Sequence, residues 1–203
     1  QTGMLNGKRI TVISTGIGTD NIDIVMNELD ALVNIDLEKR EVKKELTSLE
    51  IIRIGTSGSI NKNIPLDSFI ISKMAIGFDS LLHFYNYDHV QEFQVTEKFL
   101  KHTQWWLKKS IPYVIAADDS LVNRFLSDKT KMGITATNVG FYGPQGRILR
   151  LGLQDPDINK KMASFDYDGL QITNMEMETA GIYCLAKMMG HRAVSLNAIV
   201  ADR

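Results

Sequence analysis

Hydrophobic and polar positions along the chain fall into two kinds of spacing, which predict alternating strands and helices. Residues 8–14 predict a strand, and after a glycine turn the apolar side chains of residues 21–33 recur at helical spacing. The pattern also predicts strands over 49–54, 68–75, 111–117 and 133–138, and helices over 95–109 and 120–126. Strands that alternate with helices usually pair in parallel beneath a helical cover, which predicts the α/β class.

The last third of the chain carries the clearest pattern. From Met177 to Met188, apolar residues lie at i, i+3, i+4, i+7, i+8 and i+11, which predicts a buried helix that Gly190 ends. Residues 193–201 are apolar at nearly every position and predict a central strand covered on both faces. Asp202 and Arg203 follow at its carboxyl end, where ligands bind in open α/β sheets.

Two segments carry no clear period. Residues 38–50 are rich in Lys and Glu, which is typical of a solvated helix or an extended surface loop. Residues 77–94 predict a loop. The four histidines show no metal-site spacing and are expected in loops or at the surface: His83, His89, His102 and His191.

Composition limits the class of protein further. The chain has 203 residues, 44% of them hydrophobic, and 23 basic against 24 acidic side chains leave a formal charge of −1. These values predict one folded domain over residues 1–203 and exclude disorder. The near-neutral charge gives no excess of basic side chains for binding nucleic acid, so no nucleic-acid partner is expected. No apolar run approaches the roughly 20 residues that cross a bilayer, and Cys184 has no disulfide partner, so we expect a cytoplasmic protein without membrane contact. Because the chain opens at Gln1 and stops directly after an apolar run, we expect a domain truncated at both ends.

The first glycine turn has a partial dinucleotide-binding pattern. Gly16 and Gly18 follow the predicted strand and open a helix, and Asp36 lies about 20 residues further on. Asn21 stands where the third glycine belongs. An incomplete match of this kind favours an ordinary tight turn.

The segment Arg53-Ile54-Gly55-Thr56-Ser57-Gly58 is more informative. It reads as a strand-end arginine followed by a small, hydroxyl-bearing glycine turn. Backbone N–H groups, hydroxyls and a guanidinium are donors that suit an anion. The alternative is a plain strand-to-loop turn with Arg53 paired to a carboxylate, and local sequence alone does not separate the two.

Four blocks occur in the order and approximate spacing of the nucleoside phosphorylase family, and they resemble its uridine phosphorylase branch. The blocks are Ser14-Thr15-Gly16-Ile17-Gly18, Arg53-Ile54-Gly55-Thr56-Ser57-Gly58, Phe141-Tyr142-Gly143-Pro144-Gln145-Gly146-Arg147 and Asn174-Met175-Glu176-Met177-Glu178-Thr179-Ala180. The resemblance implies a three-layer α/β/α fold around a mixed, barrel-like sheet, and a homo-oligomer of dimers assembled into a hexamer. It also implies reversible phosphorolysis of a nucleoside to ribose 1-phosphate and free base.

The resemblance assigns roles to the matching residues. It implies a phosphate site of Gly18, Arg53, Thr56, Ser57 and Gly58. It implies a base site of Phe141, Gln145, Arg147 and Arg203, and a ribose site of Met177, Glu178 and Glu176. Arg53, Arg147 and Glu178 are the implied catalytic residues. Inorganic phosphate is then a co-substrate, and no organic cofactor or metal site is expected.

Each assignment has a purely structural alternative. Glu176 and Glu178 open a helix, where either one is favoured as a cap. They lie about 200° apart on a helical wheel, so both cannot face one ligand if the helix has begun, and Glu178 is the preferred ribose ligand. On local sequence alone Gln145 and Arg147 read as surface loop residues and Phe141 as core.

Several features depart from the family's pattern. Asp202 stands where uridine-specific members often have Asn and purine-specific members carry an acid. Asn21 replaces the Ser of a monovalent-cation site known in some members, so a cation is an optional addition. A glycine-arginine turn and two side chains from a neighbouring subunit, an arginine and a histidine, would lie before Gln1.

Three rival functions stay open from the sequence. A purine nucleoside phosphorylase is favoured by Asp202 and opposed by Gln145 with Arg147. A nucleoside-binding protein without turnover is consistent with an incomplete phosphate site. A dinucleotide-binding oxidoreductase is opposed by Asn21.

Overall fold

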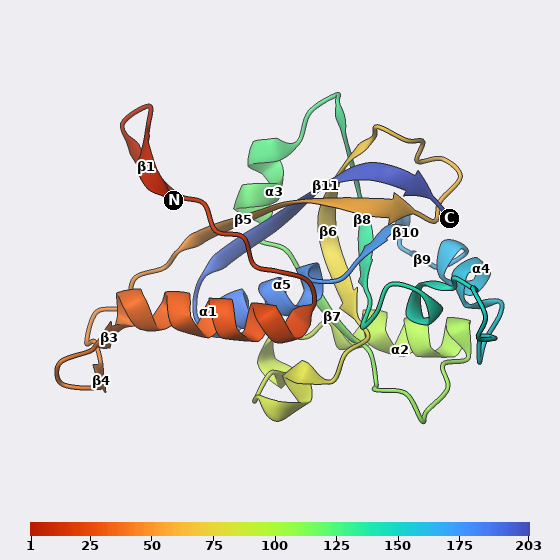
Figure 1. The fold of residues 1–203 in the computed structure, drawn as a ribbon, viewed down its shortest axis with the longest axis horizontal. Helices are drawn as coiled ribbons and strands as arrows, with labels where there is room; N and C mark the ends of the chain where they lie inside the picture. Colours follow the sequence, from red (N-terminus) through yellow and green to blue (C-terminus); the bar gives the residue numbers. More distant parts are fainter.

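The computed structural model describes residues 1–203, which fold around a mixed β-sheet flanked by helices (Figure 1). Five strands follow one another as β11 (Arg192–Asp202), β5 (Glu50–Ser59), β10 (Leu170–Glu176), β8 (Thr130–Thr137) and β6 (Phe69–Gly77). Because β6 also pairs with β11, these five strands close into a barrel. Two further strands extend it, β7 (Tyr113–Ala116) beside β6 and β9 (Asp166–Tyr167) beside β10. The predicted α/β class with a barrel-like sheet is confirmed.

Strand directions within the barrel are mixed. β5 runs parallel to β11, and β8 runs parallel to both β6 and β10. β10 is antiparallel to β5, and β6 is antiparallel to both β11 and β7. The strand–helix alternation therefore predicted only part of the pairing, because alternation reports neighbours in sequence, whereas closing the barrel joins distant strands.

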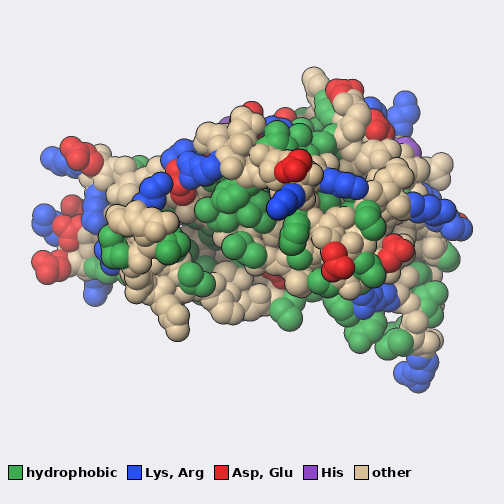
Figure 2. Space-filling view, turned by 90° about the horizontal axis from the view of Figure 1, so that it is seen from above, with side chains coloured by type: hydrophobic (Ala, Val, Ile, Leu, Met, Phe, Trp, Pro, Cys, Tyr) green, Lys and Arg blue, Asp and Glu red, His purple; other side chains and the backbone are tan.

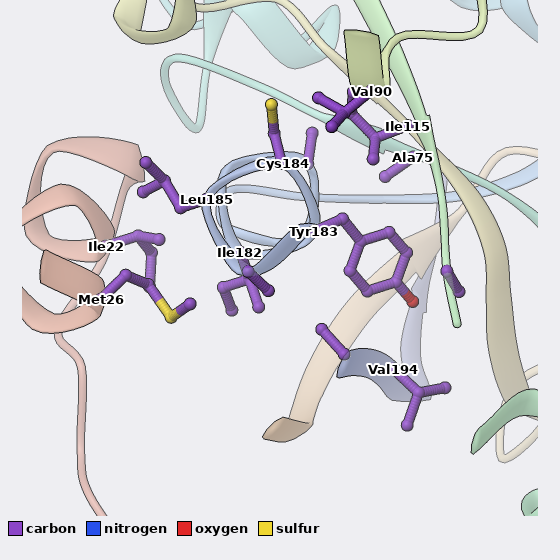
Figure 3. Packing of buried hydrophobic residues seen from close by; sticks show 14 of the residues in the cluster. Ile22, Met26, Ala75, Val90, Ile115, Ile182, Tyr183, Cys184, Leu185 and Val194 are labelled. Atoms are coloured by element: carbon purple, nitrogen blue, oxygen red, sulfur yellow. The ribbon is translucent and has the colours of Figure 1, made fainter. Parts of the chain in front are cut away.

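The helices pack around two main hydrophobic cores. They are α1 (Thr19–Asn34), α2 (Phe93–Thr103), α3 (Asp119–Phe125), α4 (Ile158–Ala163) and α5 (Thr179–Met188), with short 3₁₀ turns η1 (Leu81–Phe84), η2 (Asp88–Val90) and η3 (Gly143–Gln145). Helix α5 is the centre of the larger core: Ile22 and Met26 of α1 lie on one side of it, and Tyr183 points towards the strands (Figure 3). The second core includes Phe99 of α2 and Met162 of α4. No helix is both long and apolar enough to cross a membrane.

The predicted strand over residues 8–14 does not join the central sheet. β2 (Lys8–Thr11) pairs only with β1 (Thr2–Leu5), in an exposed hairpin that projects from the body (Figure 1). Local spacing identifies a strand without naming its partner, and here a neighbouring segment satisfies its hydrogen bonds. Helix α1 agrees with its prediction. Asp36 lies in β3 (Ile35–Asp36), beyond the far end of this 16-residue helix, which is about 24 Å long.

The glycine segment after Arg53 is not a turn, so that prediction was wrong. β5 continues through it to Ser59 and stays in parallel register with β11, where Arg53 faces Ser195 and Gly58 faces Ala201. None of these glycines has a positive φ. Glycine is required at Gly55 and Gly58 because the side chains of Arg53 and Arg203 cross the strand there.

Other boundaries and environments also differ from the sequence predictions. Helix α2 ends six residues early, because Gln104 adopts a left-handed φ of 51°. Strand β10 and helix α4 were not predicted. The charged segment 38–50 is an exposed loop in which β4 (Glu41–Val42) pairs with β3. His191 is buried rather than exposed, and its Nε2 lies 3.3 Å from Asp30.

Candidate functional site

A cavity of about 1460 Å³ opens between β5, α1, the segment that precedes α1 and the loop that follows β8. Ten of the twelve predicted site residues line it: Arg53, Thr56, Ser57, Phe141, Gln145, Arg147, Glu176, Met177, Glu178 and Arg203. Gly18 and Gly58 lie beside the cavity without lining it. Figure 2 views the molecule from above Figure 1 and shows hydrophobic side chains grouped in the middle of that face, with Lys and Arg side chains close by.

Arg53 is held from three directions on β5. Its Nη2 lies 2.7 Å from Glu178 Oε2 and 3.0 Å from Glu176 Oε2. Its Nη1 donates to Asn197 Oδ1 of β11 at 2.8 Å. A Cβ on Gly55 would lie only 2.5 Å from Nη1, so this glycine leaves room for the guanidinium to fold across the strand. Arg53 is therefore paired with carboxylates, as the structural alternative expects, and it also lines the cavity.

The two glutamates occupy the junction between β10 and α5. Glu176 ends the strand and the helix begins at Thr179, so the helix has not begun at either residue. The helical-wheel separation therefore does not apply to this pair, and both carboxylates reach Arg53. Glu176 also accepts from the N–H groups of Glu178 and Thr179, and thus caps the start of α5.

Glu178 links this junction to the first glycine turn. Its Oε1 accepts the N–H of Gly18 at 2.8 Å, while its Oε2 faces Arg53. Asn21 holds the same turn from the other side by donating to the carbonyl of Ile17. Thr15, Gly16 and Ile17 all line the cavity, so the turn forms part of its wall.

A second region of the cavity, which we call the Phe141 end, carries two guanidiniums around one aromatic ring. The Arg147 guanidinium lies 3.9 Å from the centre of the Phe141 ring and that of Arg203 lies 5.5 Å from it. A Cβ on Gly58 would lie 2.2 Å from Arg203 Nε, so Gly58 makes room for this side chain. Phe141 is about half exposed, which excludes the alternative that it is plain core.

Gln145 lies beside these cations and is 1% exposed. Its side-chain Oε1 is buried and has no hydrogen-bond partner, and the same holds for Nε and Nη1 of Arg203. This burial excludes the alternative that Gln145 is an ordinary surface residue, because η3 turns its side chain inward. Buried polar atoms without partners are costly, so this end of the cavity suits a polar ligand.

The electrostatics of the two ends differ. No ion pair of the chain includes Arg147 or Arg203. Burial and the nearby Arg147 lower the pKa of the Arg203 guanidinium to about 10. At the other end, one guanidinium faces two carboxylates. The Phe141 end therefore favours electron-rich groups, and the Arg53 end needs further donors before it can hold an anion of two charges.

Two other residues named in the sequence analysis, Asp202 and Cys184, lie outside the cavity. The Asp202 carboxylate accepts the N–H of Arg203 and does not line the cavity. Cys184 is fully buried in α5, and burial raises the pKa of its thiol to about 12, which disfavours a nucleophile. No three His, Cys, Asp or Glu side chains are grouped so as to hold a metal ion.

Asn197 is the shorter of two contacts of Arg53 that the sequence analysis missed, the other being Ser195 Oγ at 3.4 Å. It lies in the middle of the apolar strand β11, and the amide contacts Arg53 from beneath. A signal was present, because Ser195 and Asn197 are the polar residues inside an otherwise apolar run. Their spacing of two puts both on one face of the strand.

Comparisons with known proteins identify the family of the chain. The family model described as "Phosphorylase superfamily" matches residues 1–203. A uridine phosphorylase of Thermococcus kodakarensis is 30% identical over 211 residues, covering 100% of this chain and 61% of the relative. A DeoD-type purine nucleoside phosphorylase of Thermoanaerobacter sp. is also 30% identical, over 91% of this chain and 60% of its own length.

A solved structure shares the fold over the whole chain. It is a Trypanosoma brucei nucleoside phosphorylase, described as showing uridine phosphorylase activity, with a TM-score of 0.82 and 29% identity. The match covers 100% of this chain and 73% of that one. The chain spans about three fifths of the length of the curated relatives described above.

Proposed function

The chain belongs to the phosphorylase superfamily, and on that premise we propose that it is a nucleoside phosphorylase that uses inorganic phosphate to convert uridine to uracil and ribose 1-phosphate. One observation carries the proposal: a single cavity joins the Arg53 segment of β5, the carboxylate of Glu178 and the cluster of Gln145, Arg147 and Arg203. These are the groups needed for an oxyanion, a sugar and a base. Deoxyuridine and thymidine are further candidate substrates.

The Arg53 end is the proposed phosphate site. Arg53 supplies the guanidinium, and the hydroxyls of Thr56 and Ser57 line the cavity on the same strand. Phosphate placed beneath the sugar stabilises the oxocarbenium character that grows as the glycosidic bond breaks. Since Arg53 already faces two carboxylates, a phosphate dianion needs a further cation. We propose that a neighbouring subunit of a homo-oligomer supplies it, consistent with the expected assembly of dimers into a hexamer.

Ribose belongs between the two ends in this proposal. Glu178 accepts from the ribose hydroxyls, and Met177 packs against the sugar ring. Both line the cavity next to Arg53. Holding ribose and phosphate together supplies orientation, so that the phosphate oxygen meets the anomeric carbon in line with the leaving base. No covalent bond between the enzyme and the sugar is required.

The Phe141 end is the proposed base site. The Phe141 ring packs on the pyrimidine, and the partnerless amide of Gln145 meets the imide edge of uracil. The guanidiniums of Arg147 and Arg203 face the carbonyl oxygens. Departing uracil gains negative charge, which two unpaired guanidiniums stabilise more strongly than they stabilise neutral uridine.

A purine nucleoside is the second candidate substrate. The DeoD-type relative favours it, and hypoxanthine also presents a carbonyl beside an N–H donor. The position of Asp202 favours uridine, because its carboxylate is bonded to the Arg203 N–H and does not line the cavity. Adenine fits least well, since its amino group would face the guanidiniums as a donor.

Release of free base from uridine, inosine and adenosine, each with and without phosphate, tests the proposal. We expect phosphate-dependent release of uracil at the highest kcat/KM. Faster release from inosine or adenosine would assign a purine enzyme. Base release that needs no phosphate would assign a hydrolase of the same fold. Binding of nucleoside without release of any base would assign a nucleoside-binding protein.

A further inference from the structure

Polar side chains fill the interior of the barrel where apolar packing would be expected. Each of the five barrel strands contributes to one connected set of hydrogen bonds, which we call the barrel ring. Its members are Arg53 and Ser57 on β5, Asn197 on β11, Ser72 on β6, Thr135 on β8 and Asn174 on β10. All except Arg53 are at most 6% exposed.

The ring can be followed from Arg53 to Ser57. Arg53 Nη1 donates to Asn197 Oδ1 at 2.8 Å, and Asn197 Nδ2 donates to Ser72 Oγ at 2.9 Å. Ser72 and Thr135 share a hydrogen bond of 2.5 Å between their hydroxyls. Thr135 then donates to Asn174 Oδ1 at 2.9 Å, and Asn174 Nδ2 donates to Ser57 Oγ at 2.9 Å.

The donor and acceptor of each hydrogen bond in the ring can be assigned. Thr135 donates its only hydroxyl hydrogen to Asn174, so Ser72 must be the donor to Thr135. Ser57 accepts from Asn174 and keeps its own hydroxyl hydrogen, and Ser57 lines the cavity. The ring therefore begins and ends on two residues of the proposed phosphate site, four positions apart on β5.

The polarity of the ring calls for a reason beyond packing. Buried polar groups are costly unless every one is bonded, and small apolar side chains would fill a narrow barrel without that risk. None of the four intermediate members lines the cavity: Ser72, Thr135, Asn174 and Asn197. Any effect they have on a ligand must pass through Arg53 and Ser57.

We propose that the barrel ring positions the phosphate site, with Asn197 as the positioning residue for Arg53. This proposal rests on the proposed function, because that function identifies the ligand as phosphate. Asn197 meets the guanidinium on the Nη1 side, opposite the two carboxylates that hold Nη2. It thereby fixes the plane of the guanidinium, while Asn174 orients the hydroxyl of Ser57 at the other end of the segment.

The test compares two identical substitutions at buried asparagines. Asn197→Leu removes the amide at nearly constant volume. Asn34→Leu is the matched control, because Asn34 is 3% exposed, bonds Asp30 and the Thr47 N–H, and does not line the cavity. We expect Asn197→Leu to raise the KM for phosphate roughly tenfold to a hundredfold, the effect of one hydrogen bond to a charged group, with a much smaller change in the KM for uridine. Asn34→Leu should lower the melting temperature without changing the ratio of the two KM values. An unchanged ratio in Asn197→Leu overturns the proposal.

Two further measurements keep the test decisive. If Asn197→Leu does not fold, Thr135→Val breaks the ring at another strand with an isosteric side chain and should shift the phosphate KM in the same direction. In an Arg53→Ala background, Asn197→Leu should add nothing to the loss of phosphate affinity. Independent, additive losses would show that Asn197 acts on the fold alone.

A structural readout separates this proposal from the proposed function. Crystal structures of the wild type and of Asn197→Leu report the position of the Arg53 guanidinium without any turnover. If the wild type cleaves no nucleoside, the proposed function fails, and a displaced Arg53 in the variant still supports the ring. If the wild type is active and Arg53 does not move in the variant, the ring fails and the function stands.

Discussion

Adding one methyl group at Gly55 tests whether the position of Arg53 controls phosphate use. Gly55 lies within β5 and has no positive φ, so alanine fits its backbone. The new Cβ would lie 2.5 Å from Arg53 Nη1 and 2.7 Å from its Cζ. Gly55→Ala therefore pushes on the guanidinium while leaving its charge and the strand in place.

The expected size of the effect follows from these distances. Ordinary contact begins at 3.4 Å, so Nη1 must move by about 0.9 Å, the difference between 3.4 and 2.5 Å. A shift of that size breaks or lengthens the bonds to Asn197 at 2.8 Å and to Glu178 at 2.7 Å. Misplacing a catalytic group by about 1 Å costs on the order of a hundredfold in rate, or about 2.7 kcal/mol.

The assay is the initial rate of uracil release at varied phosphate concentration. Gly55→Ala should lower kcat/KM for phosphate about a hundredfold. The matched control is Gly152→Ala, since a Cβ on Gly152 meets no atom within 4 Å and should leave the kinetics unchanged. Melting temperatures of both variants show whether each protein is folded.

A folded Gly55→Ala protein with wild-type phosphate kinetics would refute the reasoning. It would mean either that the guanidinium has room to move without loss or that Arg53 does not bind phosphate. Reduced uridine affinity with normal phosphate affinity would place Arg53 at the sugar instead.

Three further results are expected. Arg147→Ala should lower uridine turnover at least about a hundredfold, as loss of an oxyanion donor does. The melting temperature should stay nearly unchanged, because the side chain is partly exposed. Normal turnover in this variant would remove Arg147 from the base site. Cys184 of the native protein should not react with thiol reagents at pH 8, since burial raises the pKa of its thiol to about 12. The urea-unfolded chain should react fully. Rapid labelling of the native protein would contradict the buried position. Burial also lowers the pKa of His191, so the unfolded state takes up a proton at a higher pH than the folded state. The free energy of unfolding should therefore fall as the pH drops below about 6.5, by up to about 1.4 kcal/mol per pH unit. Urea titrations from pH 7 to 5 should show a shallower fall in His191→Gln, and identical pH dependence in both proteins would exclude His191 as the source.

The elements with strong local signals were predicted well. Helix α1 and the strands β6, β7, β8 and β11 lie close to their predicted ranges, because the spacing of their apolar residues records which positions are buried. The continuous strand through Gly55 to Gly58 was missed. Glycine and hydroxyl residues locally favour a turn, and only the guanidiniums of Arg53 and Arg203 explain why no Cβ is tolerated there.

The ordered motifs identified the candidate site residues, but they did not predict which of these residues contact one another. Sequence named Arg53, Glu176 and Glu178 without showing that all three meet, because that depends on where the strand ends and the helix begins. The inward turn of Gln145 likewise follows from η3 and the packing of its loop.

By itself, the sequence determined the α/β class, most of the helices and strands, and the identity of the groups available for chemistry. These properties depend on residues within a few positions of one another, so spacing and motifs record them. Only the tertiary structure decided that β6 pairs with β11 to close the barrel, and that Arg53 and Asn197, 144 positions apart, share a hydrogen bond. Contacts of that kind depend on the closure of the whole chain, which no local pattern encodes.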